Sequence, residues 1–284
     1  MTFSKFLESE ASEKPHFLLI GNPVSHSVSP LMHNTALKHH QMEAIYTAVQ
    51  VDMSEIPSLS AHFNSPLFLG ANITIPFKVE LLQVVDELTS EAEAIGAINT
   101  IIKGNGKLIG HNTDAYGFVQ PLHDINLEVF DTDRALIFGT GGATKAIIYA
   151  LNDLGFEEVC LVSREPKRMD HQQDTLYCSY DTWFDYADEA SLIVNATPLG
   201  MYPNIDSSPV KDDQIEFLAE KICYDIVYNP LETKFIRQAK RANGLPIGGL
   251  DMLIHQGAES FYKWTGKRFP VGLIKMKLDE HFSI

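Results

Sequence analysis

Short apolar runs alternate with amphipathic segments along the first third of the chain. The apolar runs, rich in β-branched and aromatic residues, cover residues 17–21, 44–52 and 67–75, and helical patterns lie near 30–40 and 54–63. Because a strand, a helix and a further strand in this order form a crossover unit, the pattern predicts a parallel α/β sheet.

The stretch NTIIKGNGKLIGHNTD, residues 99–114, breaks this rhythm. Two β-rich runs flank Gly104, Asn105 and Gly106, a tight-turn sequence that is typical of a β-hairpin. We therefore expect an antiparallel edge on a mostly parallel sheet.

After residue 115 the alternation restarts. Apolar runs at 134–139, 157–163, 191–197, 221–227 and 245–249 predict a second set of parallel strands, whereas residues 166–190 show no clear pattern. The predicted fold class is α/β with two domains, preceded by a loose N-terminal extension over residues 1–15.

Composition excludes several classes of partner. A formal net charge of −15 argues against nucleic acid and against an acidic membrane surface. Three widely spaced cysteines without a CxxC pattern indicate neither a disulfide framework nor a zinc site, and we expect no metal. The N-terminus lacks the basic start and apolar run of a signal peptide, so we expect a protein of the reducing cytoplasm.

A glycine-rich turn follows the apolar run at 134–139. Gly139, Gly141 and Gly142 stand between this predicted strand and a helical pattern, where small residues let backbone N–H groups approach a pyrophosphate. Thr144 occupies the position of the third fingerprint glycine, so the strict pattern is not met. The turn indicates a dinucleotide site, although a turn that only connects the two elements has the same composition.

The end of the next predicted strand indicates which dinucleotide is bound. An acid there would bind the ribose of NAD, but this chain has Ser163 and Arg164, with Arg168 four residues further on. Two guanidinium groups suit a 2′-phosphate, which favours NADP. Glu165 lies between them and opposes their charge.

Polar side chains gather near the predicted strand ends of the first half. Asn72 and Thr74 face one side of the run at 67–75 and Lys78 follows it, while Asn99 and Asp114 lie at the two ends of the predicted hairpin. Ligands of α/β proteins bind at such strand ends.

Three serines precede the first predicted helix. Ser25, Ser27 and Ser29 lie in the stretch GNPVSHSVSP, residues 21–30, and Pro30 suits the first position of the predicted helix. Ser29 is a credible N-cap. The same helix start favours an anion such as a carboxylate, so the serines alone leave both interpretations open.

Taken together, these motifs resemble those of the shikimate dehydrogenase family. The resemblance runs from about residue 17 to 282, and the matching stretches appear in the order GNPVSHSVSP, GANITIPFK, GAINT, NTDAYG, GTGGAT, SREPKR, NATPLGM, YDIVYNP and GGLDMLIHQGAESF. It implies an NADP-dependent oxidoreductase that interconverts shikimate and 3-dehydroshikimate in the chorismate pathway of aromatic amino-acid biosynthesis. It also implies an N-terminal, mostly parallel α/β substrate domain over residues 16–115 plus 251–284, and a Rossmann-like, doubly wound NADP-binding domain over 116–250.

The resemblance also implies roles for individual residues. Hydroxyls of Ser27 and Ser29 would bind the substrate carboxylate. The remaining substrate contacts would come from Thr74, Lys78, Asn99, Asp114, Tyr228 and Gln256. The cofactor contacts would come from Gly139, Thr140, Gly141, Gly142, Ala143, Ser163, Arg164, Arg168, Thr197, Ile226, Gly249 and Met252. The family usually has asparagine at the position of Ser163 and threonine at that of Glu165, so the expected selectivity for NADP is weaker here.

Oxidation of a secondary alcohol moves a hydride to the nicotinamide and a proton to a base. We assign the proton to Lys78 and Asp114 as a coupled pair, with Lys78 as nominal acid or base and Asp114 orienting it. Two other interpretations stay open: a quinate/shikimate dehydrogenase that uses NAD, which Glu165 favours, and a catalytically silent dinucleotide sensor. We expect the chain to act on a small molecule, as a monomer or homodimer.

Overall fold

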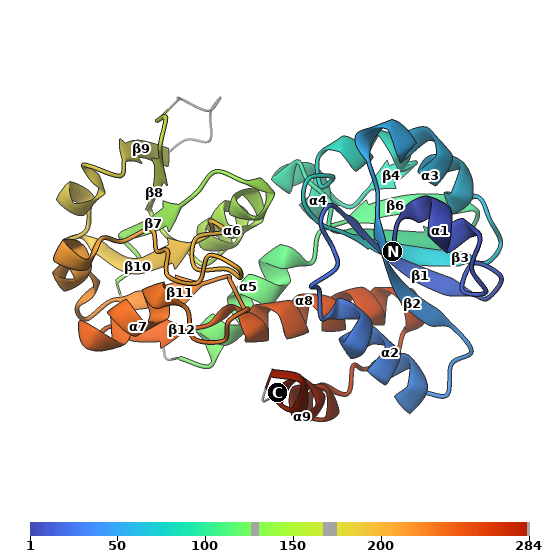
Figure 1. Cartoon of the computed structure of the whole chain (residues 1–284). Coiled ribbons are helices and arrows are strands. Elements are labelled where there is room, and N and C mark those ends of the chain that lie inside the picture. Colours follow the sequence, from blue (N-terminus) through green and yellow to red (C-terminus); the bar gives the residue numbers. More distant parts are fainter. Residues whose placement is uncertain (126–130, 167–174, 283–284) are drawn as a thin grey trace. The chain divides into compact units, whose positions relative to one another are not determined.

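The computed structural model describes residues 1–125, 131–166 and 175–282 (Figure 1). The chain forms two compact units, the first made of Met1–Thr113 with Gln256–Ile284 and the second of Asp114–His255. Within the described residues, no helix combines the length and the apolar character needed to cross a membrane.

The first unit contains a six-stranded sheet of order β2-β1-β3-β5-β6-β4. Its strands are β1 His16–Gly21, β2 Ile45–Gln50, β3 Phe68–Ile73, β4 Glu87–Leu88, β5 Thr100–Gly104 and β6 Lys107–His111. Its helices and 3-10 turns are α1 Phe3–Leu7, α2 Ser29–His39, η1 Met53–Glu55, α3 Ile56–Phe63, η2 Glu80–Val84, α4 Ser90–Ile95, α8 Gly249–Thr265, which begins in the second unit, and α9 Val271–Phe282.

The predicted pairing of this sheet is largely confirmed. β1 lies between β2 and β3 and is parallel to both, and β5 forms the expected antiparallel hairpin with β6. The hairpin is not at the edge, however, because the two-residue strand β4 pairs with β6 beyond it. A strand of two residues is too short to produce a periodic pattern.

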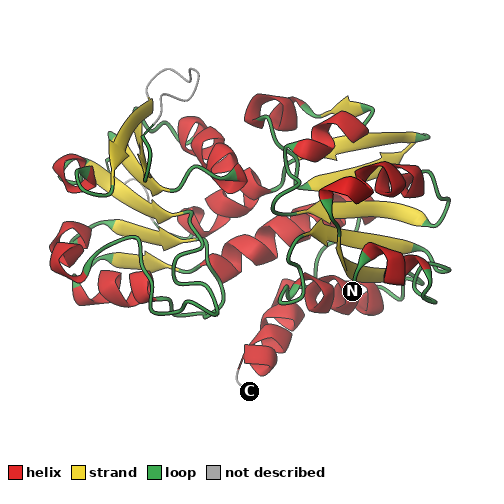
Figure 2. Ribbon diagram, turned by 45° about the horizontal axis from the view of Figure 1, so that its top comes forward, coloured by secondary structure: helices red, strands yellow, loops and turns green. Residues whose placement is uncertain are grey.

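Alternate residues of β1 face opposite sides of the sheet, as the pleat requires. Leu18 and Ile20 belong to a core that also contains buried residues of α1, α3 and α4. Phe17 points to the other side, where its ring stacks on Trp264 of α8 with centroids 4.7 Å apart. Helices therefore cover both faces of the sheet (Figure 2).

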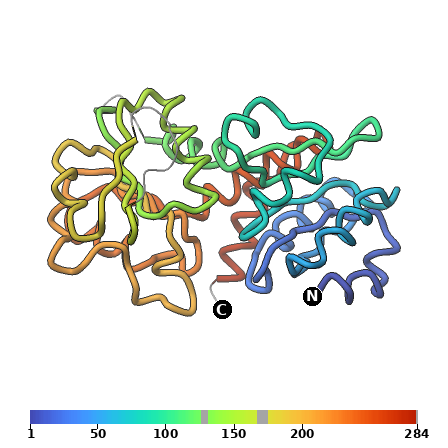
Figure 3. Tube along the Cα trace, turned by 90° about the horizontal axis from the view of Figure 1, so that it is seen from above, coloured from blue at the N-terminus to red at the C-terminus, as the bar shows by residue number. Residues whose placement is uncertain are grey.

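The expectation of a loose N-terminal extension is wrong. Phe3 and Phe6 of α1 are 1% and 0% exposed, and Thr2 forms a parallel bridge with Gln50 of the edge strand β2. The segment therefore lies along the first unit (Figure 3). Burial of two phenylalanine side chains, at about 1.5–3 kcal/mol each, offsets part of the entropy lost when the segment becomes ordered.

The second unit contains a fully parallel six-stranded sheet of order β12-β11-β10-β7-β8-β9. Its strands are β7 Arg134–Phe138, β8 Glu158–Ser163, β9 Thr175–Ser179, β10 Ala190–Asn195, β11 Ile222–Asp225 and β12 Leu245–Ile247. Its helices and 3-10 turns are α5 Asp114–His123, α6 Gly142–Asp153, η4 Trp183–Tyr186, η5 Asp212–Leu218 and α7 Lys234–Arg241.

This strand order is that of the doubly wound dinucleotide-binding fold. The first strand of the unit, β7, lies in the middle and the chain proceeds outward on either side of it. One face of the sheet packs on Trp183 and Phe235, and on the other Phe118 of α5 stacks on Tyr224 of β11. The predicted α/β fold class is confirmed, and β9 lies in the region where the sequence showed no pattern.

Candidate active site

The predicted substrate residues of the first unit gather at one edge of its sheet. Parallel strands β1 and β3 end at this edge, antiparallel β5 begins there and β6 ends there. The loops that follow β1 and β3 therefore carry Ser27, Thr74 and Lys78 to the edge where Asn99 precedes β5.

Gly21 lets the loops after β1 and β3 lie side by side. A Cβ at position 21 would stand 2.3 Å from Thr74 Cγ2. Backbone hydrogen bonds join the two loops, since Thr74 N donates to Ile20 O at 2.8 Å and Asn22 N donates to Ile75 O at 2.9 Å. The sequence analysis did not single out Gly21, although it begins the stretch GNPVSHSVSP.

The two predicted carboxylate-binding serines lie at the start of α2. The N-cap residue is Val28 and Ser29 is the first helical residue, so the N-cap interpretation of Ser29 is wrong. Pro30 is the second helical residue and not the first, so the helix begins one residue earlier than predicted. Ser27 takes a cap-like role instead, because its Oγ accepts the Ser29 N–H at 3.2 Å. A helix start of this kind still favours an anion.

Asn99 is fixed by backbone and side-chain hydrogen bonds. Its carbonyl accepts from Ile73 N at 2.7 Å, and its N–H donates to His111 O at 3.1 Å. Its side-chain Oδ1 accepts from Thr113 N at 2.8 Å, and its Nδ2 donates to Gln256 Oε1 of α8 at 3.4 Å. The structure thus brings together Asn99 and Gln256, two of the predicted substrate residues.

The two predicted proton-transfer residues differ in burial. Lys78 is half-buried in the turn after β3, and its carbonyl accepts from Ile98 N at 2.8 Å. Asp114 is 6% exposed and begins α5, directly after Thr113. Their action as a pair stays a prediction.

In the second unit, the glycine turn has two glycines that are needed for different reasons. Gly139 has φ of 107°, and a Cβ there would stand 3.0 Å from Ala196 O. Gly141 caps α6, and a Cβ at this position would have none of the described atoms within 4 Å. Thr144, at the third fingerprint position, donates from Oγ1 to Gly139 O at 3.1 Å and so closes the turn.

A buried pair that the sequence analysis missed orders the loops after β10 and β11. Asn195 Nδ2 donates to Asp225 Oδ1 at 3.0 Å, and Asn195 Oδ1 accepts from Thr197 Oγ1 at 2.6 Å. Burial raises the pKa of Asp225 to about 6, although hydrogen bonds from Thr233, Val227 and Asn195 act in the opposite direction. Asn195 lies in the motif NATPLGM and Asp225 in the motif YDIVYNP, but the sequence did not show that their side chains are buried and bonded to each other.

The start of α8 lies against the end of β11. A Cβ at Gly249 would stand 2.3 Å from Ile226 O, so only glycine fits there. Met252, one turn further along α8, is 7% exposed, and Tyr228 is half-buried. Thr197, Ile226, Gly249 and Met252 therefore belong to one end of this sheet. The contacts predicted for these residues, and for Thr140 and Ala143 of the glycine turn, stay predictions.

The predicted adenosine end lies where β8 stops. Ser163 ends the strand, and Arg164 and Glu165 follow it as exposed residues. Burial raises the pKa of Tyr180, just after β9, and the positive charge of Arg164 opposes this change, so the guanidinium lies near that tyrosine. Arg168 lies outside the described residues.

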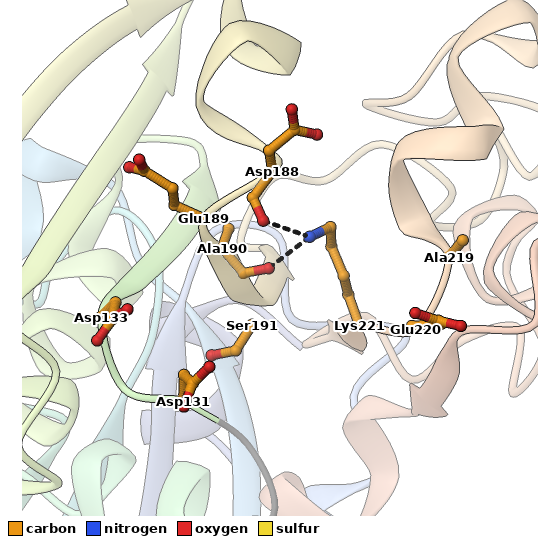
Figure 4. A pocket seen from close by; sticks show the side chains of 9 residues that line it. All are labelled: Asp131, Asp133, Asp188, Glu189, Ala190, Ser191, Ala219, Glu220 and Lys221. Atoms are coloured by element: carbon orange, nitrogen blue, oxygen red, sulfur yellow. Dashed lines mark hydrogen bonds between the residues drawn. The ribbon is translucent and has the colours of Figure 1, made fainter.

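A hollow of about 300 Å³ lies elsewhere in the second unit (Figure 4). It adjoins Asp133, Ala190 and Lys221, which are at the amino ends of β7, β10 and β11. Lys221 Nζ donates to the carbonyl oxygens of Ala190 at 2.7 Å and Asp188 at 3.4 Å. The predicted cofactor residues are at the carboxyl ends of the same parallel strands. The hollow is also lined mainly by carboxylates, which would repel a phosphate.

A doubly wound parallel sheet with a glycine turn after its central strand defines a dinucleotide-binding protein of the α/β class. Two family profiles match stretches of the chain before and after this sheet. The shikimate dehydrogenase substrate binding domain matches residues 19–101, and the shikimate 5′-dehydrogenase C-terminal domain matches residues 249–278.

Individual relatives extend this match over nearly the whole chain. A shikimate dehydrogenase (NADP+) from Salinibacter ruber is 37% identical over 263 residues, which cover 89% of this chain and 92% of the relative. The crystal structure of a Thermus thermophilus shikimate 5-dehydrogenase with NADP(H) and shikimate is 33% identical, with a TM-score of 0.79 over 93% of this chain and 98% of that one. A Corynebacterium glutamicum quinate dehydrogenase in complex with NAD is 25% identical, with a TM-score of 0.83 over 94% and 99%. The chain belongs to the shikimate dehydrogenase family.

Proposed function

We propose that this protein catalyses the reversible, NADP-dependent oxidation of shikimate to 3-dehydroshikimate. The observation that carries the proposal is the set of polar side chains at the carboxyl edge of the first sheet, where Thr74, Lys78 and Asn99 lie on adjoining loops and Gln256 bonds to Asn99. Membership of the shikimate dehydrogenase family supports the assignment of these side chains to substrate binding and proton transfer.

The substrate is a carboxylate that carries several ring hydroxyls. Ser27 and Ser29, at the start of α2, bind its carboxylate through hydroxyl and backbone donors. The ring hydroxyls are bound by Thr74, Asn99, Asp114, Tyr228 and Gln256. Lys78 takes a proton from the reacting hydroxyl during oxidation and returns it during reduction, and Asp114 orients the lysine.

The residues of the second unit fit NADP. Gly139 and Gly141 have no side chains and so leave room for a pyrophosphate at the start of α6. The space beside Gly141 is open, since none of the described atoms lies within 4 Å of its Cβ position. Arg164 is exposed at the end of β8, where a 2′-phosphate requires a cation. When bound, the nicotinamide supplies the acceptor for the hydride.

A second candidate is oxidation of quinate with NAD. Glu165 favours it, because this exposed carboxylate follows Arg164 directly and adds a negative charge next to the proposed phosphate site. We rank it second, since Arg164 occupies the position at which NAD-specific sites place an acid.

Initial rates with shikimate or quinate, each paired with NADP or NAD, test the proposal. We expect the highest kcat/KM for shikimate with NADP. A higher kcat/KM for quinate with NAD would replace the first candidate with the second. Cofactor binding without turnover of either substrate would reject both and leave the silent sensor.

A further inference from the structure

Six polar side chains form a continuous hydrogen-bond network between the first sheet and α8. Four of them, which we call the buried hub, are Asn72, Thr100, Thr113 and Ser260, all at most 5% exposed. The other two are the proposed substrate residues Asn99 and Gln256. Buried networks of this kind fix side-chain orientation when every member is satisfied.

The hub fixes which way the Asn99 amide points. Asn99 Oδ1 accepts from Thr113 N at 2.8 Å and from Thr100 Oγ1 at 2.9 Å, which uses both lone pairs of the oxygen. Its Nδ2 donates to Thr113 Oγ1 at 2.9 Å and to Gln256 Oε1 at 3.4 Å. The latter bond is long, so this N–H can exchange its partner for an oxygen of a ligand.

Ser260 connects α8 to the other members of the hub through its hydroxyl group. Its Oγ donates to Gln256 O at 3.0 Å and accepts from Asn72 Nδ2 at 2.9 Å. Two threonine hydroxyls also lie near it, Thr100 Oγ1 at 2.9 Å and Thr113 Oγ1 at 3.1 Å. Because Thr100 donates its proton to Asn99 Oδ1, we assign the hydroxyl donor to Ser260 as Thr113. Asn72 is oriented in turn by Tyr46, whose hydroxyl donates to Asn72 Oδ1 at 2.8 Å.

Without the Ser260 hydroxyl, the Thr113 hydroxyl proton has one remaining acceptor among the six side chains of the network. That acceptor is Asn99 Oδ1, 3.2 Å from Thr113 Oγ1, and its lone pairs already serve Thr100 and the Thr113 backbone. The Asn72 amide also loses the 2.9 Å acceptor. The Asn99 oxygen then receives a third donor beside the Thr113 N–H and the Thr100 hydroxyl, so the amide is held less firmly in its position.

We infer that Ser260 is a positioning residue that holds Asn99 as a hydrogen-bond donor toward the substrate, so that the ring oxygen at this point must accept. This inference rests on the proposed function. In this assignment Ser260 has no contact with substrate and acts through Asn99.

The experiment compares Ser260→Ala with a control in the same helix. Thr265→Val removes a similar hydroxyl bond, from Thr265 Oγ1 to Phe261 O at 2.7 Å, but one outside the hub. We expect Ser260→Ala to raise KM for shikimate roughly tenfold, the value of one hydrogen bond, and to leave KM for NADP within about twofold. Thr265→Val should leave both constants unchanged.

A merely structural role gives a different result. Partial unfolding reduces the amount of active enzyme and lowers the apparent kcat, with both KM values unchanged, and that outcome would overturn the inference. If Ser260→Ala does not fold, Thr100→Val removes a donor to the same Asn99 oxygen and carries the same expectation. Absence of shikimate turnover in the wild type would instead reject the proposed function.

A double-mutant cycle tests the route through Asn99. Once Asn99→Ala has removed the amide, there is nothing left for Ser260 to orient, so adding Ser260→Ala should change kcat/KM for shikimate by less than about twofold. If the fold-changes in kcat/KM of the two single variants multiply in the double variant, Ser260 acts independently of Asn99, and this result would contradict the inference.

Discussion

Gly139 and Gly141 lie in the same turn, but the physical reason for glycine differs between the two positions. Gly139 is required by the fold, because its φ is 107° and Ala196 O leaves no room for a side chain. Gly141 has an extended backbone with φ of −80° and open space at its Cβ position. The described atoms leave room for a side chain there, so space for a bound cofactor is a reason for glycine at this N-cap position that the fold alone does not supply.

The substitution Gly141→Ala separates folding from cofactor binding. We expect a melting temperature close to that of the wild type, together with a KM for NADP raised at least roughly tenfold by the methyl group at the pyrophosphate. Gly272→Ala is the matched control, since its Cβ position is also open and it lies in α9. Unchanged KM for NADP in Gly141→Ala would remove this turn from the cofactor site.

The buried side chain of His33 makes the free energy of unfolding depend on pH. Its ring stacks on Tyr46 with centroids 4.3 Å apart, and neither ring nitrogen has a hydrogen-bond partner among the described residues. Burial lowers the pKa of His33 to about 3. The folded state therefore resists a proton that the unfolded state accepts near pH 6.5.

Above pH 6.5 both states hold His33 neutral, and stability is lost as the pH falls from 6.5 toward 3. Between pH 7 and 4.5 this loss amounts to about 2–3 kcal/mol. The variant His33→Phe keeps the stack on Tyr46. Denaturant titrations at pH 7 and 4.5 should show that its free energy of unfolding falls by about 2–3 kcal/mol less than that of the wild type. His39→Phe, at an exposed histidine of the same helix, should show the same fall as the wild type. Equal pH dependence in all three proteins would contradict the assignment.

At the scale of elements, the sequence predicted those strands that are buried in the middle of a sheet. Residues 134–138 and 190–195 are almost wholly buried as β7 and β10, and such strands are continuous apolar runs. The half-buried edge strand β9 has no such run, and β4 has two residues. The helix α1 did leave a signal, because Phe3, Phe6 and Leu7 have helical spacing, but the short segment was interpreted as an extension.

The loop after β8 carries the prediction on cofactor choice. Arg164→Ala should raise KM for NADP and leave KM for NAD nearly unchanged, because only NADP has the 2′-phosphate. Loss of a charge-assisted hydrogen bond of about 1.5–3 kcal/mol corresponds to roughly a tenfold to hundredfold rise. Glu165→Thr should lower KM for NADP. Equal changes for both cofactors in Arg164→Ala would place this arginine away from the phosphate.

At the scale of the whole molecule, contacts between distant segments account for what the sequence could not predict. The motifs indicated Asn99 and Gln256 as substrate residues, but nothing in them predicted that Ser260 would bond to Asn72, 188 positions earlier in the chain. The same holds for Asn195 and Asp225, which meet only because β10 and β11 are neighbours. Motifs indicate candidate functional residues, and tertiary packing decides which other residues bond to them.

The proposed function depends most on the role proposed for Lys78, the transfer of the proton of the reacting hydroxyl. The test of this role is the kcat of Lys78→Met for shikimate oxidation with NADP. Calorimetric titrations with NADP and with shikimate show whether the variant still binds both. Methionine keeps most of the side-chain length and removes the charge. We predict a kcat lower by at least roughly a hundredfold, as general acid–base catalysis requires, with NADP binding retained. A kcat equal to that of the wild type would contradict the role of Lys78.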